Sequence, residues 1–283
     1  MTSGTLTLVA TPIGNLSDIS PRAVEALQAV DVVCCEDTRR TGMLLQHLGI
    51  SGKKYIVINE HTEFDACDEV VGKLLSGIEV ALVSDAGTPG ISDPGERLVK
   101  AAVLAGITVS SIPGPSALTM ALVMSGLSTS RFVFEGFLPR SGGERSDRIA
   151  QLVDEQRTVV LYEAPHRLER TLADLEVACG SLRRVVLARE LTKMHEEMWR
   201  GTLHDAHKHS KAEEPRGEYV LILEGAKPTA PPTDDELNQA LRDELNTGAS
   251  KKDAAARVAA KYGAPKRKVY ELALMIKLRS ERD

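Results

Sequence analysis

Aromatic side chains are scarce in this chain of 283 residues. Phe, Trp and Tyr make up 4% of it, although hydrophobic residues make up 42%. A core must therefore be built from Val, Leu, Ile and Ala, which favours a parallel α/β sheet. Apolar runs stay well short of the roughly 18 residues that a membrane-spanning helix needs, so we expect no membrane association. Strand-like sequence begins at Thr5, which leaves no room for a signal peptide and favours a cytoplasmic protein.

Several motifs of common enzyme classes are also missing. In the turn after the first strand-like run, Pro12 cannot donate the amide that a glycine-rich phosphate loop needs, and no P-loop lysine occurs. These absences disfavour NAD-dependent enzymes and P-loop NTPases, and the G-x-S-x-G nucleophile motif is missing too. The four cysteines lack metal-ligand spacing and indicate reduced structural thiols. His204, His207 and His209 cluster without cysteine or a firm helical register, so we expect no metal.

The densest signal present is S-D-A-G-T-P-G-I-S-D-P-G at residues 84–95. It follows the apolar run 80–83 and predicts an ordered turn at the carboxyl end of a strand, where open α/β sheets bind ligands. Gly87 and Gly90 would let backbone approach a ligand closely, because they lack a Cβ atom. Asp85 and Asp93 supply carboxylates for an ammonium group or for ribose hydroxyls. The alternative is a tight turn held by Asx hydrogen bonds without a ligand.

Strand-like and helix-like segments alternate along most of the chain. In the first half we expect strands at 5–10, 32–35, 55–58, 80–83 and 108–112, separated by helices at 20–27, 41–48, 65–75, 96–104 and 116–126. This repetition predicts a mostly parallel sheet covered on both faces. A second α/β unit follows, with strands at 131–138, 159–162, 185–188, 199–203 and 219–223 and helices at 144–155 and 167–179. Residues 142–143 and 208–216 are predicted to be exposed connections.

The last fifty residues differ from the rest in composition. A Pro-rich linker precedes helical segments predicted at 236–245, 252–261 and 266–279, of which the last two resemble a helix-turn-helix. From residue 250 onward ten Lys and Arg stand against four Asp and Glu, so this segment carries +6 and the preceding residues carry −11. The contrast suggests a polyanionic partner, although a solvated helix face is the alternative. The predicted domains are 1–126, 127–226 and 234–283, with the linker at 227–233.

Four polar clusters lie at the ends of predicted strands. Three of them follow a strand, and the fourth precedes one. They are E-D-T-R at 36–39, Y-E-A-P-H-R at 162–167, R-E-L-T-K at 189–193 and R-G-E at 216–218. Any one of them could be a structural ion pair. Four of them, together with two Gly/Pro-rich loops, predict that strand ends of both sheets converge on one cleft that is an active site.

These motifs carry a resemblance to a known family. The motifs are A-T-P-I-G-N-L at 10–16, E-D-T-R at 36–39, the 84–95 loop, P-G-P-S-A at 113–117, G-F-L-P at 136–139, E-A-P-H-R at 163–167, R-E-L-T-K at 189–193 and R-G-E at 216–218. Over residues 5–225 the chain resembles the ribosomal small-subunit RNA cytidine 2′-O-methyltransferases, a branch of the tetrapyrrole-methylase superfamily. The basic tail resembles the carboxyl-terminal domain of that branch. Ala10 stands where the family often has glycine.

The resemblance implies an α/β fold with two domains of the tetrapyrrole-methylase type, a cleft for S-adenosylmethionine (SAM) between them, and a small helical carboxyl-terminal domain. It also implies a homodimer. The implied substrate is a cytidine ribose in the decoding region of 16S rRNA, as naked RNA or as the assembled 30S subunit. The implied SAM-binding residues are Pro12, Ser84, Asp85, Ala86, Gly87, Thr88, Pro89, Ser116, Ala117 and Leu191.

A ribose hydroxyl is a poor nucleophile and needs a base, or a cation that stabilises the alkoxide. Candidate bases are Glu36, Asp37, Glu163 and Glu190, and candidate cationic contacts are Arg39, Arg167 and Lys193. Each could instead form a scaffold ion pair. The predicted RNA contacts of the tail are Lys251, Lys252, Lys266, Arg267 and Lys268. Two other readings stay open: a SAM-dependent methylase of a tetrapyrrole or protein, and a nucleic-acid-binding regulator whose α/β body senses a ligand.

Overall fold

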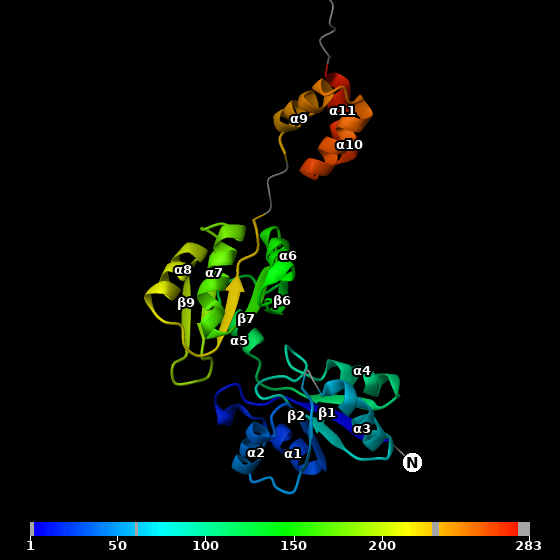
Figure 1. Cartoon of the computed structure of the whole chain (residues 1–283), viewed down its shortest axis with the longest axis vertical. Helices are drawn as coiled ribbons and strands as arrows, with labels where there is room; N and C mark the ends of the chain where they lie inside the picture. Colours follow the sequence, from blue (N-terminus) through cyan, green and yellow to red (C-terminus); the bar gives the residue numbers. More distant parts are fainter. Residues whose placement is uncertain (1–2, 60–61, 228–231, 277–283) are drawn as a thin grey trace, which may run out of the picture. The chain divides into compact units, whose positions relative to one another are not determined.

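The computed structural model of the chain describes residues 3–59, 62–227 and 232–276. The chain divides into two compact units, residues 1–226 and residues 227–283. The larger unit contains two five-stranded sheets with their helices, and the smaller unit is helical (Figure 1). In the part of the chain that is described, no helix is long and apolar enough to cross a membrane.

The first sheet of the larger unit is parallel throughout, as the alternating pattern predicted. Its strand order is β3-β2-β4-β1-β5. The strands are β1 (Thr5–Val9), β2 (Val32–Cys35), β3 (Lys54–Val57), β4 (Val80–Leu82) and β5 (Thr108–Ile112). Neighbouring residues of a strand point to opposite faces, so Val33 and Cys34 enter two different cores. Both faces of this sheet are therefore buried.

Two pairs of helices cover these faces. One face carries α1 (Pro21–Ala29) and α2 (Thr38–His47), and the other carries α3 (Glu63–Leu75) and α4 (Glu96–Leu104). The short 3-10 helix η1 (Leu16–Asp18) precedes α1. Helix α1 begins with Pro at its first position, and the Ser20 side chain accepts the Ala23 amide. Helix α2 begins three residues before its predicted start, because Asp37 caps it by accepting the Arg39 amide.

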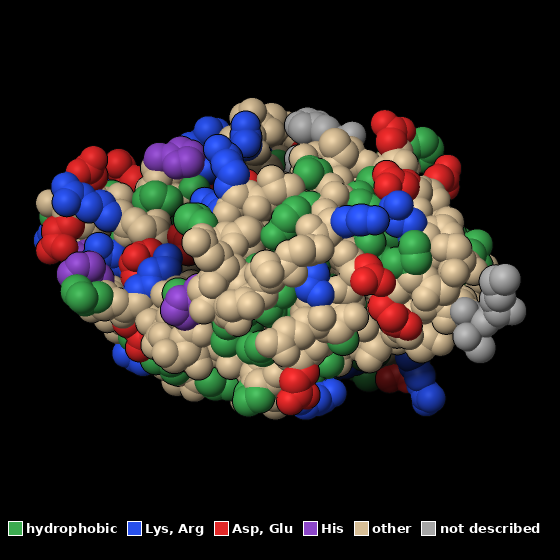
Figure 2. Space-filling model, turned by 90° about the horizontal axis from the view of Figure 1, so that it is seen from below, with side chains coloured by type: hydrophobic (Ala, Val, Ile, Leu, Met, Phe, Trp, Pro, Cys, Tyr) green, Lys and Arg blue, Asp and Glu red, His purple; other side chains and the backbone are tan. Residues whose placement is uncertain are grey.

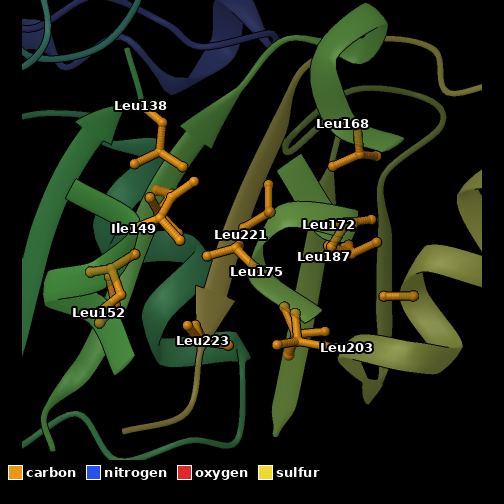
Figure 3. Packing of buried hydrophobic residues seen from close by; sticks show 14 residues of the cluster. Leu138, Ile149, Leu152, Leu168, Leu172, Leu175, Leu187, Leu203, Leu221 and Leu223 are labelled. Atoms are coloured by element: carbon orange, nitrogen blue, oxygen red, sulfur yellow. The ribbon is translucent and has the colours of Figure 1, made fainter. Parts of the chain in front are cut away.

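The second sheet is mixed, with strand order β6-β7-β10-β8-β9. Its strands are β6 (Phe132–Phe137), β7 (Thr158–Glu163), β8 (Arg184–Arg189), β9 (Glu197–Thr202) and β10 (Tyr219–Leu223). Strands β6 and β7 are parallel, and the other neighbours are antiparallel. On one face, leucines of α7 (Pro165–Cys179) meet those of β8 and β10 (Figure 3). Helices α6 (Gly142–Val153) and α8 (Leu203–Ala212) complete this layer, and α5 (Ala117–Met124) packs on the opposite face.

Two predicted connections in this region were wrong in part. Gly142 and Gly143 form the first turn of α6, and residues 208–212 belong to α8 rather than to an exposed connection. Helix α8 starts at a capping box in which the side chains of Thr202 and Asp205 bond to each other's amides. The resulting helical register brings the histidines of α8 against α7. The sequence around residues 208–212 does not by itself show this contact between α8 and α7, because the two helices are separate segments of the chain.

The smaller unit contains α9 (Asp234–Asn246), α10 (Lys251–Tyr262) and α11 (Lys266–Met275). The three helices bury a common apolar core that includes Leu237, Leu241, Val258 and Val269. Helix α10 ends at Gly263, whose φ of 61° lies in the left-handed region. The end predicted for the last helix, at residue 279, and linker residues 228–231 lie outside the described part of the chain.

Charged side chains of both signs are interspersed on the face shown in Figure 2. In the structure many charged side chains pair with a neighbour of opposite sign, such as Arg148 with Glu135 at 2.9 Å and Lys73 with Glu69 at 3.4 Å. The overall charge of −5 is therefore not gathered into one acidic surface on that face.

Candidate active site

Two loops meet at the carboxyl end of the first sheet. The connection after β1 leads to α1 on one face, and the connection after β4 leads to α4 on the other, so these neighbouring strands form a topological switch point. The Thr11 amide donates to the Gly87 carbonyl at 2.9 Å, and the Gly87 amide donates to the Thr11 carbonyl at 3.0 Å. Gly87 has a φ of 84°, where a side chain would be strained. Ligands bind at switch points of this kind.

A cleft of about 330 Å³ opens beside this junction. Both sheets contribute to its walls. The first sheet and its connections supply Ile13, Ala86, Gly87, Thr88, Ile91, Ser92, Asp93, Ser116 and Ala117, and the second supplies Phe137, Tyr162, Glu163, Ala164, Pro165, Ala188, Leu191, Glu218, Tyr219 and Val220. Its volume lies in the range of cofactor sites, and its walls are mostly apolar with a few polar groups.

Six of the predicted SAM-binding residues line this cleft: Ala86, Gly87, Thr88, Ser116, Ala117 and Leu191. Pro12, Ser84, Asp85 and Pro89 are not among its walls. Ser84 is buried behind the loop, and its hydroxyl bonds to the carbonyls of Ala86 and Gly87 at 3.3 Å. The Asp85 carboxylate accepts the Asp37 amide at 3.2 Å and lies 3.5 Å from Arg40. These two side chains support the loop from behind.

The candidates Glu36, Asp37 and Arg39 lie at the end of β2, outside the walls of the cleft. The Asp37 carboxylate accepts the Arg39 amide at 2.8 Å and pairs with the Arg39 guanidinium at 2.7 Å. These hydrogen bonds lower the pKa of Asp37 to about 2. Asp37 thus caps helix α2 and forms an ion pair with Arg39. The catalytic roles expected of Glu36, Asp37 and Arg39 stay predictions.

Glu163 contributes to the cleft wall, but its carboxylate is turned inward and is 1% exposed. It accepts hydrogen bonds from the Thr171 hydroxyl at 2.5 Å and the Ala164 amide at 2.9 Å, and Arg167 lies 3.2 Å away. Arg167 also donates to the Leu138 carbonyl, and Arg145 donates to Thr171 at 3.0 Å. This network fixes the turn between β7 and α7, so its side chains hold the wall in place.

Glu190 and Lys193 form an ion pair on the loop that follows β8. Lys193 lies 2.9 Å from Glu190 and 2.8 Å from Glu218. Burial favours the neutral form of both groups, but their hydrogen bonds prevail. The bond from Lys193 and that from the Glu218 amide lower the pKa of Glu190, and the bonds to Glu218 and Glu190 raise the pKa of Lys193. Both groups therefore stay charged. Leu191 faces the cleft between them, while Glu190 and Lys193 are not among its walls.

The cleft also contains residues outside the predicted catalytic and SAM-binding sets, among them Asp93, one of the two loop carboxylates expected to meet an ammonium group or ribose hydroxyls. Asp93 is half-buried in its wall; burial and the nearby Glu36 raise its pKa to about 6. Phe137 packs edge-on against Tyr162 with ring centroids 5.7 Å apart. Asp93 belongs to the dense 84–95 loop and Phe137 to the G-F-L-P motif, so the sequence contained both signals. The sequence did not show which side chains of those motifs face the cleft.

The histidine cluster on α8 pairs with Glu176 of α7. His204 and His207 bond to its two oxygens at 2.9 and 2.7 Å, and His209 stacks on Trp199. These hydrogen bonds, that of His207 first, lower the pKa of Glu176 to about 2. Across the described residues, no group of three or more His, Cys, Asp or Glu side chains is arranged to hold a metal ion.

The five predicted RNA contacts of the smaller unit differ in their surroundings. Lys251 donates to the carbonyls of Leu274 and Ile276 at 3.2 and 2.8 Å, which closes the end of α11. Arg267 pairs with Glu271 at 3.0 Å and Lys268 pairs with Asp234 at 2.6 Å. Lys252 and Lys266 are exposed, with no ion pair to any other described residue. These two cations are the ones best placed to meet phosphate.

Comparisons with known proteins agree with this architecture. Residues 5–207 match the family of Tetrapyrrole (Corrin/Porphyrin) Methylases, and residues 231–277 match the RsmI C-terminal HTH domain. A Synechocystis protein named ribosomal RNA small subunit methyltransferase I is 49% identical over 275 residues, which are 96% of this chain and 98% of that protein. A Haemophilus influenzae protein of the same name is 42% identical over 277 residues, 96% of this chain and 97% of that protein.

Solved structures share the fold at low sequence identity. Diphthine synthase superposes with a TM-score of 0.61 at 17% identity, over 78% of this chain and 90% of that one. The fold class and the family resemblance inferred from the motifs are both confirmed. The chain belongs to the tetrapyrrole methylase family and, over nearly its whole length, to its ribosomal RNA small subunit methyltransferase I members.

Proposed function

We propose that this methyltransferase transfers the methyl group of SAM to the 2′-hydroxyl of a cytidine in 16S rRNA. The observation that carries the proposal is the cleft at the switch point, in a chain 49% identical to a ribosomal RNA small subunit methyltransferase I. The small basic unit supports an RNA substrate over a tetrapyrrole, because two of its lysines project without a protein partner among the described residues. A bacterial cytoplasmic location follows from this substrate.

The residues of the cleft fit SAM. Ile13, Ala117 and Leu191 offer apolar surface for an adenine ring, and Gly87 lets the loop backbone come close. Ser116 and Ala117, at the amino end of α5, line the cleft, and the Ser116 side chain makes no capping hydrogen bond to the first amides of the helix. A helix amino terminus favours a negatively charged group such as the carboxylate of the methionine moiety. When bound, SAM supplies an electrophilic methyl group on a sulfonium.

The chain's own residues must position the acceptor oxygen and receive its proton. Holding an oxygen in line with a methyl group can contribute much of the rate enhancement, because the attack no longer depends on a chance encounter. The inward-facing network around Glu163 keeps the β7–α7 turn rigid, and the Thr11–Gly87 hydrogen bonds do the same for the opposite wall. A narrow cleft between two fixed walls suits such an in-line transfer.

The predicted division of the chain belongs to this proposal. Residues 1–126 and 127–226 would be the two methylase domains that hold the cleft, and residues 234–283 would be an appendage that docks on RNA beyond the linker at 227–233. The same proposal includes a homodimer, as the resemblance implied. Sedimentation of the purified protein at several concentrations tests the dimer.

Transfer of tritiated methyl from SAM tests the proposed function directly. The substrates are undermethylated 30S subunits and naked 16S rRNA, and the labelled nucleoside is identified after complete digestion of the RNA. We expect 2′-O-methylcytidine with at least one of the two substrates. Label in a base, label in protein, or no transfer to either RNA while a tetrapyrrole is methylated would refute the proposal.

A further inference from the structure

One aromatic ring in the wall of the cleft is open to solvent. Phe137, the last residue of β6, lines the cleft and is 50% exposed. Tyr162 and Tyr219 also belong to the wall, and both are more deeply buried. The apolar surface that we assign to the adenine of SAM comes from other residues. The Phe137 ring is therefore available to a second planar group.

A bulge in β6 aims this ring at the cleft. In a regular strand, residues three apart point to opposite faces. The register of β6 against β7 shifts between Phe134 and Gly136, and Gly136 has a φ of 62°, which glycine tolerates. Because of this shift, Phe134 and Phe137 both pack edge-on against Tyr162, with ring centroids 5.0 and 5.7 Å away. Leu138 belongs to the leucine core on the other face (Figure 3).

Three arginines hold the segment that follows the ring. Their guanidinium groups donate to the successive carbonyls of residues 138–140: Arg167 to the first, Arg145 to the second at 3.0 Å and Arg170 to the third at 3.3 Å. Each of these groups also has a carboxylate of β7 or α7 nearby, at 3.2, 2.9 and 3.9 Å respectively. The segment is thus fixed before any ligand arrives, which lowers the entropy cost of binding.

Arg140 differs from these three arginines, because its guanidinium holds no part of the scaffold. Arg140 is exposed and forms no ion pair with any other described residue. It follows Phe137 by three residues, so the two Cα atoms lie at most roughly 11 Å apart. A guanidinium binds phosphate oxygens in a bidentate manner. An aromatic ring and a cation this close together match the flat base and the phosphate of a nucleotide.

We propose that Phe137 and Arg140 together hold the acceptor nucleotide of the RNA, an inference that rests on the proposed function. The base of that nucleotide stacks on the Phe137 ring, and its phosphate pairs with the Arg140 guanidinium. Proteins commonly hold an unpaired RNA base by stacking it on an aromatic side chain. Because the ribose lies between the base and the phosphate, fixing both of them positions its 2′-hydroxyl for the transfer.

The substitution Phe137→Leu keeps an apolar side chain and removes the flat ring. We expect kcat/KM for the RNA that wild type methylates to fall about tenfold or more, the usual effect of losing one base stack. The SAM dissociation constant, measured by calorimetry, should stay within about twofold of wild type. Phe137→Tyr restores a ring and should recover most of the activity. The matched control is Phe132→Leu at the other end of β6, because Phe132 is 40% exposed but lies outside the cleft. Its activity should match wild type.

The substitution Arg140→Ala tests the phosphate contact. The slope of log K for RNA binding against log salt concentration should fall by about 0.7, the value for one contact to a single strand. The control is Arg131→Ala, because Arg131 precedes β6, is exposed and forms no ion pair with any other described residue. Its slope should equal that of wild type. An unchanged slope for Arg140→Ala, or an equal fall for both variants, would overturn the contact.

Other outcomes also count against the proposal. Activity of Phe137→Leu within about threefold of wild type excludes a stacked base at this position. Loss of SAM affinity in proportion to the loss of rate makes Phe137 a cofactor contact. A lower melting temperature of Phe137→Leu, with no recovery of activity in Phe137→Tyr, makes the ring structural. Failure of the proposed function is distinct from these results, because wild type itself would then methylate neither RNA substrate.

Discussion

Removal of the Glu63 side chain should loosen the loop that contains Asp93. Glu63 is 8% exposed on α3, and its Oε1 accepts the amides of Gly95 and Arg97 at 3.0 Å and of Leu98 at 3.4 Å. These amides belong to the first turn of α4, where Gly95 offers no side-chain cap of its own. Glu63 thus caps a helix that starts more than thirty residues later. Its charge also faces the positive end of the helix dipole.

The size of the effect follows from these contacts. A hydrogen bond to a charged group contributes about 1.5–3 kcal/mol, and loss of a helix cap costs ~1 kcal/mol. The three amides share one oxygen, so we expect Glu63→Ala to lower the free energy of unfolding by about 3 kcal/mol. Glu63→Gln keeps the acceptor and loses the charge, so its cost should be about 1 kcal/mol. A domain is typically stable by only about 5–15 kcal/mol, so the larger loss is easily measured.

Urea unfolding followed by tryptophan fluorescence measures this loss in the larger unit alone, because Trp199 of β9 is the single tryptophan of the chain. The control is Glu69→Ala on the same helix. Glu69 pairs with Lys73 at the surface at 3.4 Å, and such pairs contribute less than about 0.5 kcal/mol. If Glu63→Ala unfolds within 0.5 kcal/mol of wild type, the cap across the two helices is not what holds α4.

Three further substitutions test other parts of the structure. Gly87→Val should abolish SAM binding in calorimetry while the protein stays folded, because the side chain enters the cleft at a φ of 84°; unchanged affinity would remove this loop from the site. Replacing both Lys252 and Lys266 with alanine should reduce the slope of log K for RNA binding against log salt concentration by about 1.5. Lys251→Ala should mainly destabilise the smaller unit, because Lys251 bonds to the carbonyls at the end of α11. A slope for the double variant equal to that of wild type would contradict phosphate contacts. Glu176→Gln should be less stable than wild type at pH 6. Folding lowers the pKa of this carboxyl from 4.5 to about 2, so the difference in melting temperature should shrink as the pH falls through that range, and a constant difference would argue against the histidine pair.

The sequence by itself determined the architecture and the place of the cleft. Short apolar runs separated by helical segments predict parallel strands, because a crossover helix returns the chain to the start of the next strand. The first sheet has this form. The glycines and prolines at 84–95 predict a turn at the carboxyl end of a strand, and this loop lines the cleft. The motifs together identified the family, which the comparisons confirmed.

Tertiary structure decided which polar side chains of those motifs face the cleft. Successive residues at a strand end point to opposite sides. The hydrogen-bond or ion-pair partner of each side chain comes from another segment of the chain. The Glu163 carboxylate accepts a hydrogen bond from Thr171 of the following helix α7, and Lys193, after β8, pairs with Glu218, which lies just before β10. Asp93, in contrast, lines the cleft, hydrogen-bonded to Ser84 and near the negative charge of Glu36.

The same distinction applies to the helices of the carboxyl-terminal parts. Local charge predicted five equivalent cations, but Lys251 closes the end of α11 and Lys268 meets Asp234 of α9. Residues 208–216 were predicted to be an exposed connection, yet residues 208–212 belong to α8. Leu203 and Ala206 of this helix are buried against the second sheet, and Glu176 of α7 binds His204 and His207. Side-chain identity sets what a residue can bind, and only the packing of distant segments sets what it meets.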